Sequence, residues 1–134
     1  MTQKEKKLIE FDICSRFPYG DVYVKLGDTD MKVIDIYYSR NDVVFNLVGE
    51  KTNLGVEADR LRPYLKPLSS LTEEDMKLCR GLGAVFAYDG KNWELWLRSH
   101  DALNWLISNH YDVNGLIDLG LALPALEWMY REVE

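Results

Sequence analysis

The strongest constraint in the sequence is a period-two alternation of apolar and polar residues through much of its first half. Apolar residues recur at every second position, and polar turn residues such as Gly27-Asp28 interrupt the pattern. Because the side chains of a strand alternate between the two faces of a sheet, this pattern predicts an antiparallel meander with one covered face. We expect three or four strands, at residues 22–26, 32–38, 43–47 and 54–57.

A helix is predicted ahead of the meander, over residues 3–17. Ile9, Ile13 and Phe17 recur at a spacing of four and belong to a broad apolar face. Pro18 ends this helix because the residue before a proline avoids helical dihedral angles. The apolar face of the helix is the natural cover for part of the sheet.

The second half of the chain predicts a smaller helical lobe with a hairpin. Thr72 followed by three acidic residues is a strong helix start, and this helix ends near Gly81. Asp89-Gly90 between two short apolar runs indicates a β-hairpin. Further helices are expected over 100–109 and from Pro124 to about residue 133.

These elements give an α+β fold. We expect a helix-plus-meander lobe at residues 1–65 and a helical lobe with a hairpin at 66–134, packed as one compact unit. The joint at 58–68 contains Pro63 and Pro67, and it is predicted to be an ordered, extended connector rather than a flexible linker.

Charge argues against a nucleic-acid partner. The net charge is −6, and the excess acid lies after Ser70, where 5 basic residues face 11 acidic ones. Since non-specific affinity for nucleic acids comes from neutralised phosphates, such a half repels them. The neutral N-terminal lobe keeps the alternative of a nucleic-acid-associated accessory protein open through two basic clusters, Lys4, Lys6 and Lys7, and Arg60, Arg62 and Lys66.

Signatures of catalysis, cofactor binding and metal binding are missing from the sequence. There is no glycine-rich phosphate loop, no nucleophile elbow and no metal-binding His or Cys spacing. His110 lies on the apolar stripe of its predicted helix, so we expect a buried, hydrogen-bonded core residue. An enzyme is therefore not predicted. The alternative, a small hydrolase or metal-dependent enzyme, requires a cleft in which His110, or clustered carboxylates such as Asp112 and Asp118, converge.

Membrane insertion and export are not predicted. No run approaches the roughly 20 apolar residues of a membrane span. The lysine-rich start leads directly into an amphipathic segment rather than into a signal peptide. The sequence thus indicates an intracellular, cytoplasmic protein.

Two tryptophans are the candidate partner-binding residues. Trp105 lies opposite the apolar stripe of the helix at 100–109, and Trp128 lies off the stripe of the predicted terminal helix. Tryptophans outside the apolar stripe either pack on a second side or face a partner, and interfaces are enriched in such residues.

Three stretches span nearly the whole chain: Arg16–Gly20 (RFPYG), Arg62–Asp75 (RPYLKPLSSLTEED) and His110–Ala122 (HYDVNGLIDLGLA), with Met129-Tyr130 in the tail. Together they resemble a group of small proteins of unassigned activity that prophages and mobile elements of Bacteroides-type gut bacteria encode. The resemblance implies a cytoplasmic, phage-related context and provides no catalytic residues.

The favoured function is a non-enzymatic binding or adaptor module that acts through contact with a protein partner or through self-association. It rests on the missing catalytic groups, on the two tryptophans and on the open strand edges that a small meander leaves, since such an edge accepts a strand from a partner.

Overall fold

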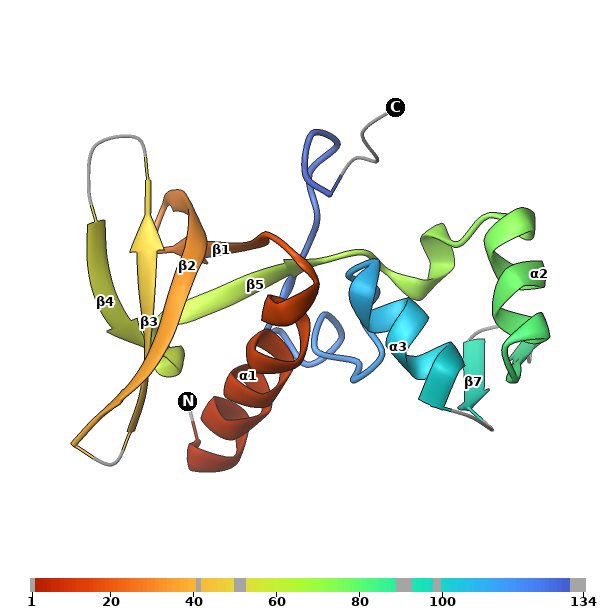
Figure 1. Cartoon of the computed structure of the whole chain (residues 1–134), viewed down its shortest axis with the longest axis horizontal. Helices are drawn as coiled ribbons and strands as arrows, with labels where there is room; N and C mark the ends of the chain where they lie inside the picture. The colour runs from red at the N-terminus through yellow and green to blue at the C-terminus, as the bar shows by residue number, and fades with distance from the viewer. Residues whose placement is uncertain (1, 41, 50–52, 89–92, 98–99, 131–134) are drawn as a thin grey trace.

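The computed structural model describes residues 2–40, 42–49, 53–88, 93–97 and 100–130, with the backbone alone at 85–88 and 93–97. The fold is α+β, as predicted, and the molecule is elongated (Figure 1). A sheet lies at one end, two helices and a hairpin lie at the other, and helix α1 stands between them. The elements in chain order are α1 (Gln3–Arg16), β1 (Val22–Leu26), β2 (Thr29–Ser39), β3 (Asp42–Val48), β4 (Asn53–Glu57), β5 (Leu61–Leu65), α2 (Glu73–Gly81), β6 (Ala84–Tyr88), β7 (Trp93–Leu97), α3 (His100–Ser108) and β8 (Leu123–Pro124), with short 3-10 turns at Phe17–Tyr19, Ala58–Arg60 and Leu68–Ser70.

The sheet has six strands in the order β4-β3-β2-β1-β5-β8. The first four form the expected antiparallel meander, and a β-bulge shifts the register of β2 against β3 between Val33 and Asp35. The segment 58–68 is ordered and extended, as predicted, but it also contains a strand that the sequence did not predict, because β5 lies within it and pairs antiparallel with β1. Pro63 is accommodated in this strand because β8 covers only Tyr64 and Leu65 on the other side, which leaves β5 close to an edge strand.

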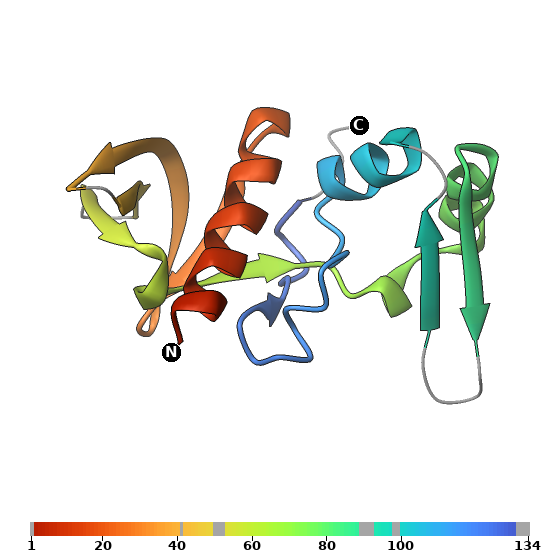
Figure 2. The ribbon, with the colours of Figure 1, turned by 90° about the horizontal axis from the view of Figure 1, so that it is seen from below.

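Helix α1 packs over the inner face of the sheet, as predicted (Figure 2). Thr2 and Glu5 form a capping box at its start. Ile9 and Ile13 are fully buried in the main core together with strand residues such as Phe45. Cys14 and Cys79 each lie in an apolar helical pattern of the sequence, which predicts two buried thiols. Cys79 is buried, but Cys14 is exposed, so the prediction is wrong for Cys14.

A second, smaller core joins α2, α3 and the hairpin of β6 and β7. Thr72 caps α2 by accepting a hydrogen bond from the Asp75 backbone, as its sequence signature predicts. Cys79, Ala102 and Leu106 are fully buried in this core. The hairpin pairs as expected, although its predicted Asp89-Gly90 turn lies outside the described residues.

The C-terminal segment returns to the sheet instead of forming the predicted helix from Pro124. Leu116 and Leu121 enter the main core, and β8 adds a short parallel strand to β5. The Ala125 amide donates to the Leu65 carbonyl, so the backbone after Pro124 pairs with β5 where a helix was expected. Only a single turn follows, closed by a hydrogen bond from the Met129 amide to the Leu126 carbonyl.

A fully buried ion pair connects α1 to the C-terminal half. The Arg16 guanidinium donates to both carboxylate oxygens of Asp12, at 2.9 and 3.0 Å. It also donates to the Tyr111 carbonyl at 2.6 Å and to the Ile107 carbonyl at 3.4 Å. The Asn114 side-chain amide donates to Asp12 at 3.1 Å, so both charges have partners across the boundary between the halves.

Replacing Arg16 with methionine should lower the free energy of unfolding by about 3–5 kcal/mol, because it leaves the Asp12 carboxylate buried without its counter-ion. The double variant Asp12→Leu/Arg16→Met should lose less than Arg16→Met alone, since no buried charge remains. Urea unfolding measures both. A loss below about 1 kcal/mol for Arg16→Met would contradict this account.

Candidate binding cleft

A cleft of about 520 Å3 opens where the start of β1, the end of α3 and the C-terminal loop meet. We call it the aromatic cleft. Its lining residues come from segments far apart in the sequence: Tyr19, Gly20, Asp21, Tyr23, Lys66, Ser108, Asn109, His110, Trp128 and Tyr130.

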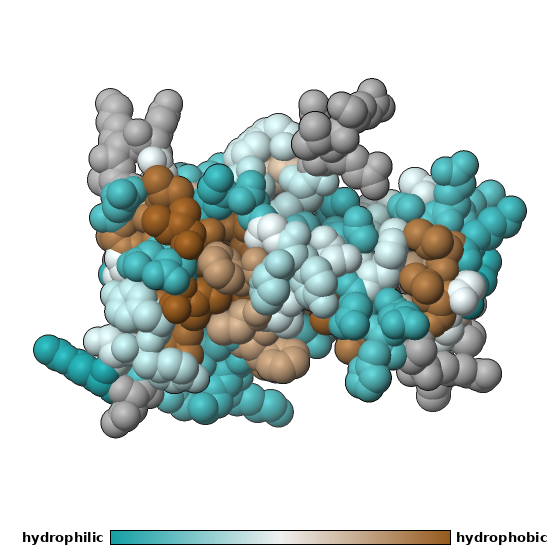
Figure 3. All heavy atoms as spheres, in the orientation of Figure 1, coloured by the Kyte–Doolittle hydropathy of each residue, from teal (hydrophilic) through white to brown (hydrophobic). Residues whose placement is uncertain are grey.

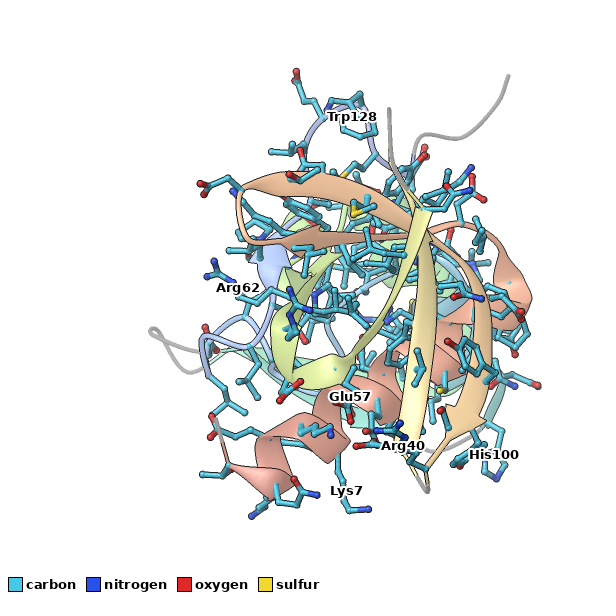
Figure 4. All side chains as sticks on the ribbon, turned by 90° about the vertical axis from the view of Figure 1, so that its left-hand side faces the viewer. Lys7, Arg40, Glu57, Arg62, His100 and Trp128 are labelled. Carbon is cyan, nitrogen blue, oxygen red and sulfur yellow. The ribbon has the colours of Figure 1, made fainter. Side chains whose placement is uncertain are left out.

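The wall of the cleft is a continuous group of four rings. Trp128 and Tyr130 both meet Tyr23 edge to face, each with ring centroids 5.2 Å apart. His110 stacks nearly parallel on Tyr130 at 3.8 Å. Trp128 is half exposed at the rim and projects from the molecule on the side away from Lys7 and Arg40 (Figure 4). Edge-to-face contact holds the rings in fixed positions, so the half-exposed Trp128 ring offers a pre-organised apolar surface to flat or ring-shaped groups of a ligand.

Tyr130 anchors the C-terminal loop to β1. Its hydroxyl accepts a hydrogen bond from the Tyr23 amide at 2.8 Å and donates to the Tyr23 carbonyl at 3.4 Å. The phenol thus bonds the backbone amide and carbonyl of Tyr23, which lies one residue beyond Val24, the last β1 residue that pairs with β5. Burial raises the pKa of Tyr130 well above its ordinary value, so its hydroxyl keeps the proton that it donates.

His110 is the most unusual group in the wall. It is only 7% exposed, and it holds a left-handed backbone conformation with φ of 66°. His110 is buried, as predicted, but its buried Nδ1 has no hydrogen-bond partner among the described residues, so the predicted hydrogen bonding is not met at this atom. Burial, reinforced by the positive charges of Arg16 and Lys66, lowers its pKa to about 3. The imidazole is therefore neutral at physiological pH.

The lining of the cleft carries charges of both signs. The Asp21 carboxylate is well exposed and forms a loose ion pair of 3.7 Å with Lys32. The Lys66 ammonium lies 5.2 Å from the centre of the Tyr111 ring. A ligand here meets a carboxylate and an ammonium as well as aromatic walls, an arrangement that a peptide satisfies through its mixed side chains and its backbone.

The two candidate tryptophans occupy different environments. Trp128 belongs to the aromatic cleft, although the loop that carries it is not the predicted helix. Trp105 is half-buried, packs against the second core and stacks on Tyr111 at a centroid distance of 6.0 Å. Trp105, which lies opposite the apolar stripe of α3, therefore packs on Tyr111 within the chain.

The groups of the alternative enzyme hypothesis are held in separate arrangements. Both oxygens of Asp112 accept backbone amides, from Leu116 at 2.8 Å and Ile117 at 3.0 Å. This is the turn role that its position before Gly115 indicates. Asp118 is exposed and does not line the aromatic cleft.

No sequence pattern predicts that Tyr23, Tyr130 and Lys66 line a cleft. Tyr23 stands between two buried valines of β1, so the period-two pattern places its ring on the other face of the sheet, but without identifying a neighbour there. The contact with Tyr130 joins positions 107 residues apart, and a misassigned terminal helix conceals it.

In comparisons with known proteins, no family model, curated protein or solved structure matches the chain. Among the described residues, no helix is long and apolar enough to cross a membrane. Nor do the described residues bring together three His, Cys, Asp or Glu side chains in a group that fits a metal ion.

His110 should cause the free energy of unfolding to fall as the pH is lowered. In the unfolded chain its pKa is about 6.5, and in the folded chain it is about 3, so below pH 6.5 the unfolded state binds a proton that the folded state refuses. Between pH 7 and pH 5 this costs about 2 kcal/mol. His110→Phe, which keeps a ring on Tyr130, should lose that part of the pH dependence in urea unfolding. Identical slopes for the two proteins would refute the assignment.

Proposed function

We propose that this protein is a non-enzymatic binding module that holds an extended segment of a protein partner in the aromatic cleft. The single observation that carries the proposal is the half-exposed Trp128 at the rim of a cleft walled by Tyr23, Tyr130 and His110. Hot spots of protein interfaces are enriched in tryptophan and tyrosine, because these side chains bury a large apolar area with few rotatable bonds.

The geometry of the cleft favours a peptide that carries proline or aromatic side chains. The Trp128 ring, held edge to face against Tyr23 and half exposed, offers an apolar surface to such side chains, and grooves lined with aromatic residues are the usual docking sites of extended, proline-rich segments. An extended peptide also leaves its carbonyls free to accept hydrogen bonds from groups at the rim.

The electrostatics favour a peptide over a nucleic acid. Aromatic rings also stack on unpaired bases, so the experiment below also tests the alternative of a nucleic-acid partner. However, the net charge of −6 and the Asp21 carboxylate in the cleft oppose a phosphate backbone. The resemblance to prophage-encoded proteins is in keeping with an adaptor role in a bacterial cytoplasm, and this context is part of the proposal.

Selection of a displayed library of short random peptides on the full chain should enrich proline- or aromatic-containing sequences. Trp128→Ala should lower the affinity for the best synthetic peptide at least tenfold, which is about 1.4 kcal/mol of binding free energy. Fluorescence anisotropy measures this affinity. The matched control is Leu126→Ala, which removes an exposed apolar side chain of the same loop that does not line the cleft, and it should bind like the unmodified chain.

Trp105→Phe separates the two tryptophans, because it keeps a ring on Tyr111 and leaves the cleft intact. Loss of binding in Trp105→Phe but not in Trp128→Ala would move the interface to α3 and overturn the assignment. No enrichment of peptides, together with binding of a single-stranded oligonucleotide that weakens steeply with salt, would favour the nucleic-acid alternative.

A further inference from the structure

The two edges of the six-stranded sheet are protected very differently. At one edge, β8 is two residues long and contains Pro124, which lacks the amide that a further strand would need. At the other edge lies β4, five residues long, and no described strand pairs with its outer side. Figure 1 shows β4 beside β3 at the sheet end of the molecule.

β4 also lacks the devices by which proteins usually prevent pairing of an edge strand. It has no proline and no lysine, and its register against β3 runs without a bulge. Its one charged residue, Glu57, binds the Lys6 ammonium at 3.1 Å and is held within the molecule's own ion-pair network. Hydrophobic side chains reach the surface at this sheet end of the molecule (Figure 3).

We propose that β4 pairs antiparallel with β4 of a second copy of this chain, forming a symmetric dimer with one continuous sheet. The sequence of β4 is self-complementary around Gly55. In that register Gly55 faces Gly55 of the other copy, Leu54 faces Val56, and Asn53 faces Glu57. The charged residue therefore meets an amide, and no like charges oppose each other.

The side chains give this register an apolar and a polar face. Val56 is buried in the main core and Leu54 is half-buried beside it, and both point to the covered face of the sheet. Pairing around Gly55 would cover the remaining exposed part of Leu54 and join the two cores. On the opposite face the Tyr37, Val44 and Asn46 side chains of each copy cover Gly55. On that face the Asn53 amide can donate to a Glu57 carboxylate of the other copy.

The dimer should be weak, because a five-residue strand pair is a small interface, and small interfaces belong to transient complexes. Sedimentation equilibrium of the full chain should show a monomer–dimer equilibrium. Leu54→Lys places a charge in the apolar row and should weaken dimerisation at least tenfold. The matched control is Asn53→Lys, which puts the same side chain opposite Glu57 and should preserve or tighten the dimer.

Two further measurements keep the proposal open to refutation. Mixing Leu54→Lys with Leu54→Glu should restore a dimer, since the two introduced charges lie diagonally across the strand pair. In the unmodified chain, the outward amides of β4 should gain hydrogen-exchange protection as concentration rises, which needs no variant. A chain that stays monomeric at its highest soluble concentration, or a dimer that Leu54→Lys does not weaken, would overturn the proposal.

Because this edge and the aromatic cleft have no residue in common, the proposed dimer stands independently of the proposed function. Trp128→Ala should leave the monomer–dimer equilibrium unchanged, and Leu54→Lys should leave peptide affinity unchanged. A dimer that dissociates in Trp128→Ala would place the contact at the cleft instead of at β4.

Discussion

The buried pair of Arg16 and Asp12 is the interaction on which the arrangement of the molecule depends. It lies at the last turn of α1, where the helix that covers the sheet faces the segment after α3. Two backbone carbonyls and one side-chain amide complete its hydrogen bonds. Removing charges from water is costly unless such partners are in place, so the pair is satisfied only when the two halves of the chain are docked correctly.

This docking also positions the cleft. The Tyr111 carbonyl that binds Arg16 follows directly after His110, and the Lys66 amide binds the His110 carbonyl at 2.8 Å. The left-handed conformation of His110 turns the chain out of α3 at this point. The backbone at His110 is therefore held through its own carbonyl and through that of Tyr111, while Tyr130 stacks on the His110 ring from the C-terminal loop.

Local sequence signals predicted most of the fold. The period-two alternation located β1 to β4, and the cap at Thr72 located α2, because these signals are set by neighbours in the sequence. They failed where distant pairing decides the structure. Pro63 suggested a connector, yet pairing with β1 makes it part of β5. Apolar spacing after Pro124 suggested a helix, yet pairing with β5 draws that segment into the sheet.

The same distinction applies to the candidate site. Trp128 was predicted to bind a partner because it is a tryptophan outside the apolar stripe of a predicted helix. It does line the cleft, but it lies on a loop rather than on a helix. Its partners Tyr23 and Tyr130 depend on a contact that no local pattern contains. The unpaired Nδ1 of His110 contradicts the general rule for buried polar groups, which local reasoning can only assume to hold.

The rim that bears Trp128 is a single turn, fastened by the buried Met129 and by the phenol of Tyr130. The exposed positions beside these anchors contribute to neither hydrophobic core. Mutations there can alter what the rim contacts at little cost to stability, as is general for loops carried on a rigid scaffold. Under the proposed function, the choice of partner can thus evolve separately from the architecture that supports the rim.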